Sequence, residues 1–183
     1  MPPPATYIDL CAVPPPSTAE LIDGRLIVQQ QPKARHQAGV SALNLELGLR
    51  YRKGRGGPGG WWIIEEPEVH FIRDIVVTVP DLAGWTRPRM PKLPDDHRFE
   101  VITDWICEVL SPSTSVTDRT IKLPLYAQHG VAWIWLLDPD TEILETYTLL
   151  NGAWRLDRTF GPADEVSAAP FLEANFTVAS IFT

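Results

Sequence analysis

The segment 105–138 constrains the fold more than any other part of the chain. It begins and ends with nearly continuous apolar runs, 105–110 and 131–138. Between them, 117–129 has helical character, and Pro124 inside it predicts a kink or a late helix start. Continuous apolar runs are typical of strands that are covered on both faces. We therefore expect two parallel strands joined by a right-handed helical crossover.

The rest of the chain adds more strands and one long helix. Apolar residues at helical spacing predict a helix over 36–52, and Asp23-Gly24 and Asn151-Gly152 predict hairpin turns. A long loop is expected over 84–100, where basic residues and prolines follow each other closely. The remaining strands are predicted at 21–22, 25–29, 61–65, 68–72, 75–79, 142–150 and 153–160. The fold class is therefore α/β, with a mixed central sheet flanked by helices and an added C-terminal β-hairpin.

The length and composition of the chain predict a single folded domain. The chain has 183 residues, of which 44% are hydrophobic and 21% are charged, as in ordinary globular proteins. Six prolines within residues 1–16 predict a loose, extended arm, which leaves 17–183 as the domain. No apolar run is long enough to cross a bilayer and no signal peptide is recognisable, so we expect a cytoplasmic protein without membrane contact. Two cysteines, Cys11 and Cys107, are too few for a disulfide framework.

The charge of the chain is unevenly distributed. The net charge is −7, of which −6 falls in residues 138–183 and −1 in residues 1–137. Two basic clusters lie in the first part, and they are formed by Arg50, Arg52, Lys53 and Arg55 and by Arg87, Arg89, Lys92 and Arg98. Such clusters are either solvated surface or local contacts with phosphate groups. An acidic chain can therefore still bind nucleic acid.

Two carboxylates occur in apolar surroundings where an unpaired charge is expensive. Asp81 follows the apolar stretch 75–80, and Glu108 lies inside the run 105–110. Each carboxylate needs a cation or a hydrogen-bond donor, which Arg119 or Lys122 on the following helix could supply. One interpretation is a buried salt bridge that ties the helix to the sheet. The other is a divalent cation held by both carboxylates, with Lys122 reaching the same place.

The motifs around these residues resemble the Uma-two family of bacterial endonucleases, within the PD-(D/E)XK, restriction-endonuclease-like superfamily. The resemblance spans about residues 17–182 and includes Glu20–Gly24 and His36. Its most specific parts are Val79-Pro80-Asp81-Leu82, the stretch 104–114 with its "EVLSPST", Asp118-Arg119 with Lys122, Tyr126-Ala127 and Gly130-Val131. The resemblance implies a mixed sheet of four to five strands flanked by helices, with a metal site at one edge.

The resemblance also implies the roles of individual residues. Asp81 and Glu108, with the Val109 carbonyl, would hold Mg²⁺, with Mn²⁺ as a substitute. Lys122 would orient the attacking water or stabilise the transition state, because Leu110 stands where the family's usual lysine would be. Glu20 resembles an extra acidic catalytic residue and has capping-box spacing to Ser17 as well.

These roles imply a Mg²⁺-dependent endonuclease that hydrolyses DNA. A homodimer is one assembly that the sequence allows. The alternative is a non-catalytic module that keeps the fold and binds nucleic acid or protein. His36 is either a packed residue or part of the site, and Trp85, beside the second basic cluster, is a candidate for stacking on a base.

Overall fold

Eleven strands form two β-sheets in residues 3–183, the part of the chain that this computed structural model describes. The five-stranded sheet has the order β2-β1-β5-β4-β7, with strands β1 Thr18–Ile22, β2 Arg25–Gln29, β4 Glu68–Ile72, β5 Val76–Thr78 and β7 Arg98–Phe99. The six-stranded sheet has the order β11-β10-β9-β8-β6-β3, with strands β3 Trp61–Glu65, β6 Leu82–Thr86, β8 Trp105–Val109, β9 Trp133–Asp138, β10 Ile143–Leu150 and β11 Ala153–Phe160. Both sheets are mixed, so the α/β fold class is confirmed, although the sequence predicted one sheet.

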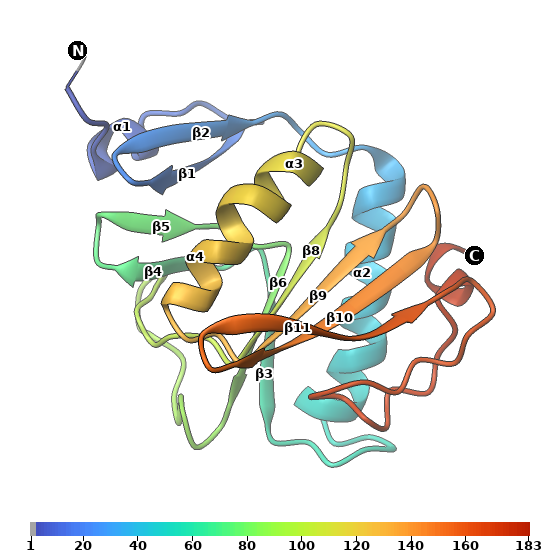
Figure 1. Cartoon of the computed structure of the whole chain (residues 1–183). Coiled ribbons are helices and arrows are strands. Elements are labelled where there is room, and N and C mark those ends of the chain that lie inside the picture. The colour runs from blue at the N-terminus through green and yellow to red at the C-terminus, as the bar shows by residue number, and fades with distance from the viewer. Residues whose placement is uncertain (1–2) are drawn as a thin grey trace.

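The helices lie mainly against the six-stranded sheet. They are α1 Tyr7–Cys11, α2 Ala34–Leu47, η1 Gly48–Arg52, α3 Ser115–Thr117, η2 Asp118–Lys122, α4 Leu123–Gln128 and η3 Ala179–Phe182. Helix α2 covers one face of the sheet, and the α3–η2–α4 segment crosses the other face (Figure 1). No helix among the described residues is long and apolar enough to cross a membrane.

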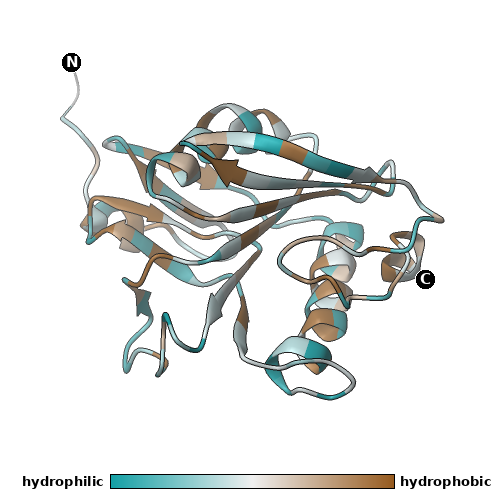
Figure 2. Cartoon of the chain, turned by 60° about the horizontal axis from the view of Figure 1, so that its bottom comes forward, coloured by the Kyte–Doolittle hydropathy of each residue, from teal (hydrophilic) through white to brown (hydrophobic). Residues whose placement is uncertain are grey.

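Strands β8 and β9 are parallel neighbours, as the sequence predicted, with Glu108 paired to Leu136. Alternate residues of β8 enter different cores, because successive side chains of a strand point to opposite faces. Trp105 and Cys107 pack with α2 on one face, whereas Ile106 packs with α4 on the other. Apolar residues follow the packed strands, while many outer segments are hydrophilic (Figure 2). Glu108, two residues after Ile106, therefore points to the face that α4 covers.

Both predicted hairpins are present. Asp23 and Gly24 have φ values of 51° and 68°, and Asn151 and Gly152 have 52° and 78°. Positive φ at both central residues is the signature of the type I′ turn, which matches the twist of paired strands. The turn at Asp23-Gly24 fixes the register of β1 and β2 and so determines which residues of β1 face the helix.

The predicted loop over 84–100 is wrong at both ends. Residues 82–86 form β6, which pairs with β3 and β8 inside the six-stranded sheet, and Arg98 belongs to β7. Gly84 looks like a chain breaker in the sequence but has a packing role here. A Cβ at Gly84 would lie 3.1 Å from the ring of Trp105 and 3.3 Å from that of Trp61. The missing side chain lets two tryptophans from neighbouring strands close over β6.

The two predicted helices are present, each with one wide turn. Helix α2 begins two residues before the predicted start and continues into the π-helical turn η1, so the helix ends at Arg52 as expected. The second π-helical turn, η2, directly precedes α4, in which Pro124 lies within the first two positions. Proline has no N–H to donate to the preceding turn, and this accounts for the irregularity at the place where the sequence predicted it.

The prediction of an extended arm is wrong for residues 7–11, which form helix α1. Thr6 caps this helix, and Leu10 is buried against Leu21 and Val77 of the five-stranded sheet. Tyr7 donates a hydrogen bond to Glu68 Oε1 at 2.5 Å. The proline content predicted an extended arm and gave no sign of this docking. The division of the chain into arm and domain at residue 16 stays a prediction.

Candidate active site

A cavity of about 280 Å³ lies where β8 ends and α2 begins. Three of the predicted site residues, Asp81, Glu108 and Lys122, line it. Asp81 precedes β6, Glu108 is in β8 and Lys122 ends the turn η2, so three elements separated in sequence meet here. The other residues that line the cavity are Thr18, Gln29, Gln30, Gln31, Pro32, Lys33, His36, Glu66, Val79, Ser111, Ser113, Thr114 and Asp118.

Lys122 lies at the centre of a buried group of carboxylates. Its Nζ is 2.8 Å from Glu108 Oε1 and 3.1 Å from Glu20 Oε1. All three side chains are almost fully excluded from solvent, with relative exposures of 1% or 2%. Glu20 also accepts hydrogen bonds from Val79 N at 2.9 Å and Gln29 Nε2 at 3.2 Å. The structure thus joins Glu20 to Lys122 and Glu108, although Glu20 lies behind the lysine rather than on the wall of the cavity.

Two further residues complete this group, and the sequence analysis gave neither a role. Asp118 is buried with Oδ1 3.5 Å from Lys122 Nζ, and Tyr126 donates a hydrogen bond of 2.6 Å to Glu108 Oε1. Their spacing was the available signal, since 118, 122 and 126 are four residues apart and lie near one another on a helix. Both contacts that Glu108 makes with the helix use Oε1, which leaves Oε2 for a ligand in the cavity.

Asp81 is held beside Glu108 by the main chain of β8. Its Oδ2 accepts a hydrogen bond from Val109 N at 2.7 Å, and its Oδ1 lies 3.2 Å from His36 Nε2. The side chain of Asp81 is 17% exposed, so it reaches the cavity while its geometry is fixed from two sides. His36 is in the first turn of α2 and is buried, which makes it part of this arrangement rather than an isolated packed residue.

The electrostatics of the group follow from burial and from an excess of negative charge. Burial raises the pKa of Glu108 well above its usual value. The positive charge of Lys122 lowers this pKa, whereas the nearby charges of Asp118, Asp81 and Glu20 raise it further. Burial alone would lower the pKa of Lys122, but the surrounding carboxylates outweigh it and raise that pKa, so the lysine is held in its charged form. Burial likewise raises the pKa values of Glu20 and Asp118.

His36 has a raised pKa for a similar reason. Burial lowers it, but the hydrogen bond to Asp81, the charge of that carboxylate and the Val109 carbonyl together outweigh the burial. In the whole group, the carboxylates outnumber the two basic residues, Lys122 and His36.

The donor set suits a hard divalent cation that keeps several water ligands. Among residues 3–183, no three His, Cys, Asp or Glu side chains are arranged as a ready-made metal site. Mg²⁺ is commonly bound through only one or two carboxylates, together with water and substrate phosphate. Asp81 and Glu108 supply two carboxylates on one cavity, and Glu20 and Asp118 place two more carboxylates around Lys122. The residues present therefore fit such an ion.

Two other candidate roles are wrong. Arg119 does not reach the buried carboxylates but pairs with Glu145 of β10, at 2.7 Å. Trp85 is fully buried and donates a hydrogen bond to the Val101 carbonyl at 2.7 Å, so its ring has no free face for a base.

Neither basic cluster contributes a residue to the cavity. The first cluster lies at η1, which follows the C-terminal end of α2, whereas the cavity is lined by Lys33 and His36 at the N-terminal end of that helix. In the second cluster, Arg87 lies 3.3 Å above the ring of Trp62, and Arg89 pairs with Asp104 at 2.6 Å. These two arginines contact the protein's own side chains.

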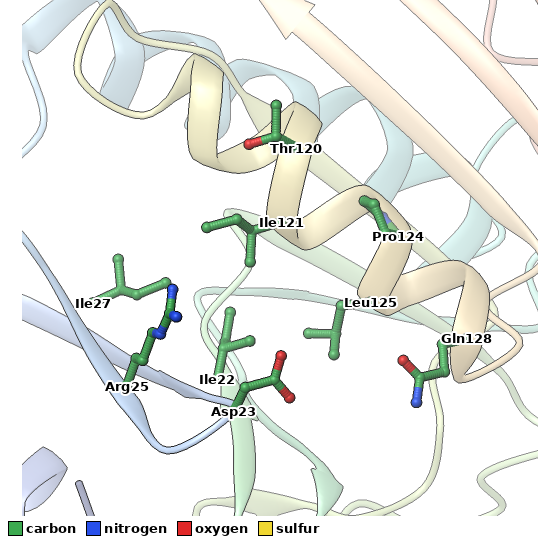
Figure 3. A pocket seen from close by; sticks show the side chains of 9 residues that line it. All are labelled: Ile22, Asp23, Arg25, Ile27, Thr120, Ile121, Pro124, Leu125 and Gln128. Atoms are coloured by element: carbon green, nitrogen blue, oxygen red, sulfur yellow. The ribbon is translucent and has the colours of Figure 1, made fainter. Parts of the chain in front are cut away.

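A second hollow, of about 360 Å³, lies between the β1–β2 hairpin and α4. Ile22 and Leu125 meet at its base, and Asp23, Arg25 and Gln128 lie around its edge (Figure 3). Glu20 and Ile22 are two residues apart on β1 and so point to the same face, which places the Glu20–Lys122 contact between the two hollows. The second hollow contains none of the predicted site residues.

Comparisons with known proteins agree with this architecture. The solved structure of a protein from Anabaena variabilis, described as a "putative nuclease belonging to DUF820", superimposes with a TM-score of 0.73 at 24% identity and covers 98% of both chains. At that identity the likeness shows the fold alone. No functionally curated protein matches the chain. The model of the family described as "Putative restriction endonuclease" matches residues 4–180, and the chain therefore belongs to the Uma2 family.

Proposed function

We propose that the protein is a Mg²⁺-dependent endonuclease that hydrolyses phosphodiester bonds of DNA at the Asp81–Glu108–Lys122 cavity. Family membership supports a nuclease that acts on nucleic acid. The observation that carries the finer proposal is the buried group in which one lysine faces three carboxylates beside a cavity that Asp81 also lines. A structural salt bridge needs only one carboxylate for one lysine. The additional buried carboxylates destabilise the folded protein unless a cation or a substrate interacts with them.

In this proposal, Asp81 and Glu108, with the Val109 carbonyl, would hold the ion. The chemistry that it would supply when bound is a lower pKa of a water ligand and neutralisation of the charge that develops on the phosphate. Lys122 keeps its proton and supplies positive charge to the transition state from a site with little water, where electrostatic interactions are strong. Glu20 and Asp118 hold the lysine ammonium in place. His36 and Val109 N fix the orientation of the Asp81 carboxylate.

The test is a plasmid-nicking assay with Mg²⁺ or Mn²⁺. We expect wild-type protein to nick the plasmid, Asp81→Asn to abolish nicking, and Lys122→Met to reduce turnover by roughly two to three orders of magnitude, as for the loss of one transition-state donor. Arg119→Ala is the matched control, because Arg119 is on the same helical turn but pairs with Glu145 on the surface. Wild-type nicking that persists unchanged in Asp81→Asn would show that this cavity is not the active site.

A further inference from the structure

Lys33, at the mouth of the cavity, is a cation that the proposed mechanism does not use. It is the N-cap residue of α2, and its side chain makes no capping hydrogen bond. Helix N-termini favour Ser, Thr, Asp or Asn at this position, and a positive charge there is unfavourable because the helix end is itself partly positive. Departures from local rules of stability are expected at functional sites. The combination of Lys33 and the helix end suits a negatively charged ligand.

The neighbouring cations are already occupied. Arg35 binds Glu142 at 2.5 Å and the Pro139 carbonyl at 2.6 Å, and Arg119 binds Glu145. In the described part of the chain, by contrast, the exposed Lys33 side chain has no ion-pair partner, so it is available to a ligand.

A group of hydroxyls borders the same cavity. Ser111, Ser113 and Thr114 belong to the loop between β8 and α3, and all three line the cavity with Lys33. Ser111 Oγ lies 2.9 Å from Ser113 Oγ and 3.0 Å from Thr114 Oγ1. Ser113 is exposed and its hydroxyl makes no other hydrogen bond among the described residues, so it can turn toward a ligand. Lysines and serine or threonine hydroxyls are common partners of backbone phosphate oxygens.

We propose that Lys33 and the Ser113 hydroxyl hold backbone phosphates of the nucleic acid, so that the strand crosses the cavity between the 29–33 segment and the 111–114 loop. This inference rests on the proposed function. The acidic floor of the cavity repels an incoming phosphodiester, and the rim supplies the attraction that positions it above Asp81 and Glu108. The Arg50–Arg55 cluster, at the far end of the same helix, has no part in this contact.

The chain provides a matched pair of lysines for the test. Lys33 and Lys53 are the N-cap and the C-cap of the continuous helix α2–η1, about 30 Å apart at the usual rise per residue. Both are exposed, so neither substitution by glutamine should disturb folding, which circular dichroism can check. Binding of a short fluorescent DNA duplex is measured by anisotropy at several salt concentrations, with EDTA present to prevent cleavage.

We expect Lys33→Gln to flatten the plot of log affinity against log salt concentration by about 0.9, the value for one phosphate contact on duplex DNA. Lys53→Gln should leave the slope unchanged. Ser113→Ala should weaken binding about 2- to 10-fold with little change in slope, as for one neutral hydrogen bond. Its control, Ser115→Ala, lines a different hollow and should bind like wild type.

This inference would be overturned if the salt dependence of DNA affinity changed in Lys53→Gln and not in Lys33→Gln. If the wild-type protein still nicked plasmid in that case, the proposed function would remain supported. A wild-type protein that neither binds the duplex nor nicks plasmid would overturn both.

Discussion

Lys122 has its charged end where water hardly reaches, and the neighbouring residues determine what that charge can do. Three carboxylates lie within 3.5 Å of its ammonium group, and the Tyr126 hydroxyl donates a hydrogen bond to one of them, Glu108. Tyr126 and Lys122 share Glu108 Oε1, which fixes the orientation of that carboxylate. Removing one member of such a group leaves a buried polar atom unpaired, which is far more costly than losing a surface contact.

Tyr126→Phe tests this residue-level arrangement. We expect it to lower the free energy of unfolding by about 1.5–3 kcal/mol, the usual cost of losing a hydrogen bond to a charged group, and to weaken Mn²⁺ binding because Glu108 is no longer held. Urea denaturation and calorimetric titration with Mn²⁺ measure the two effects. Tyr147→Phe is the control, since its hydroxyl donates to Glu145 Oε2 at 2.9 Å outside the cavity. Equal effects of both variants on Mn²⁺ binding would contradict the positioning role.

At the scale of elements, the site depends on the docking of the β1–β2 hairpin and of α1 behind it. Glu20 reaches Lys122 because β1 pairs with β5 beside the helix, and α1 covers the other side of β1 through Leu10. Apolar contacts of a five-residue helix must provide its stability, because an isolated helix of that length is unstable.

Leu10→Ala and Ile8→Ala distinguish a docked helix from a loose arm. Leu10 is 8% exposed and Ile8 is 80% exposed, although both lie on α1. We expect Leu10→Ala to lower the free energy of unfolding by about 2–3 kcal/mol, as for a buried leucine at the edge of a core. Ile8→Ala should change it by less than about 0.5 kcal/mol. Urea denaturation measures both, and a neutral Leu10→Ala would mean that α1 does not pack on the sheet.

At the scale of the whole molecule, acidic groups gather at the cavity, while the first basic cluster lies at the other end of α2. The metal-free protein must tolerate four carboxylates close together, and burial, with the charges of Asp118, Asp81 and Glu20, raises the pKa of Glu108. A ligand that binds the folded protein and relieves this repulsion should stabilise it by mass action.

We therefore expect Mn²⁺ or Mg²⁺ to raise the melting temperature. At a concentration 100 times the dissociation constant, the stabilisation is about 2.7 kcal/mol. Asp81→Asn should remove most of this gain, because it removes one of the two proposed ligands and one charge. Thermal denaturation with and without metal measures the effect. An unchanged wild-type melting temperature at millimolar metal would contradict the proposed metal site.

The sequence by itself determined the features that local signals encode. Asp23-Gly24 and Asn151-Gly152 specify their turns because few other residue pairs accept two positive φ values. The apolar runs of β8 and β9 specify buried parallel strands, and a charge inside the first run marks Glu108 as exceptional.

Only the tertiary structure decided the features that depend on contacts between distant segments. Gly84 belongs to a strand because two tryptophans close over it, which no local pattern reveals. Arg119 and Lys122 are three residues apart, yet one pairs with β10 and the other is buried beside Glu20 and Glu108. Their roles follow from which side of the helix faces the sheet. The packing of the whole molecule sets that orientation, because it buries the most apolar surface while leaving each buried charge a partner.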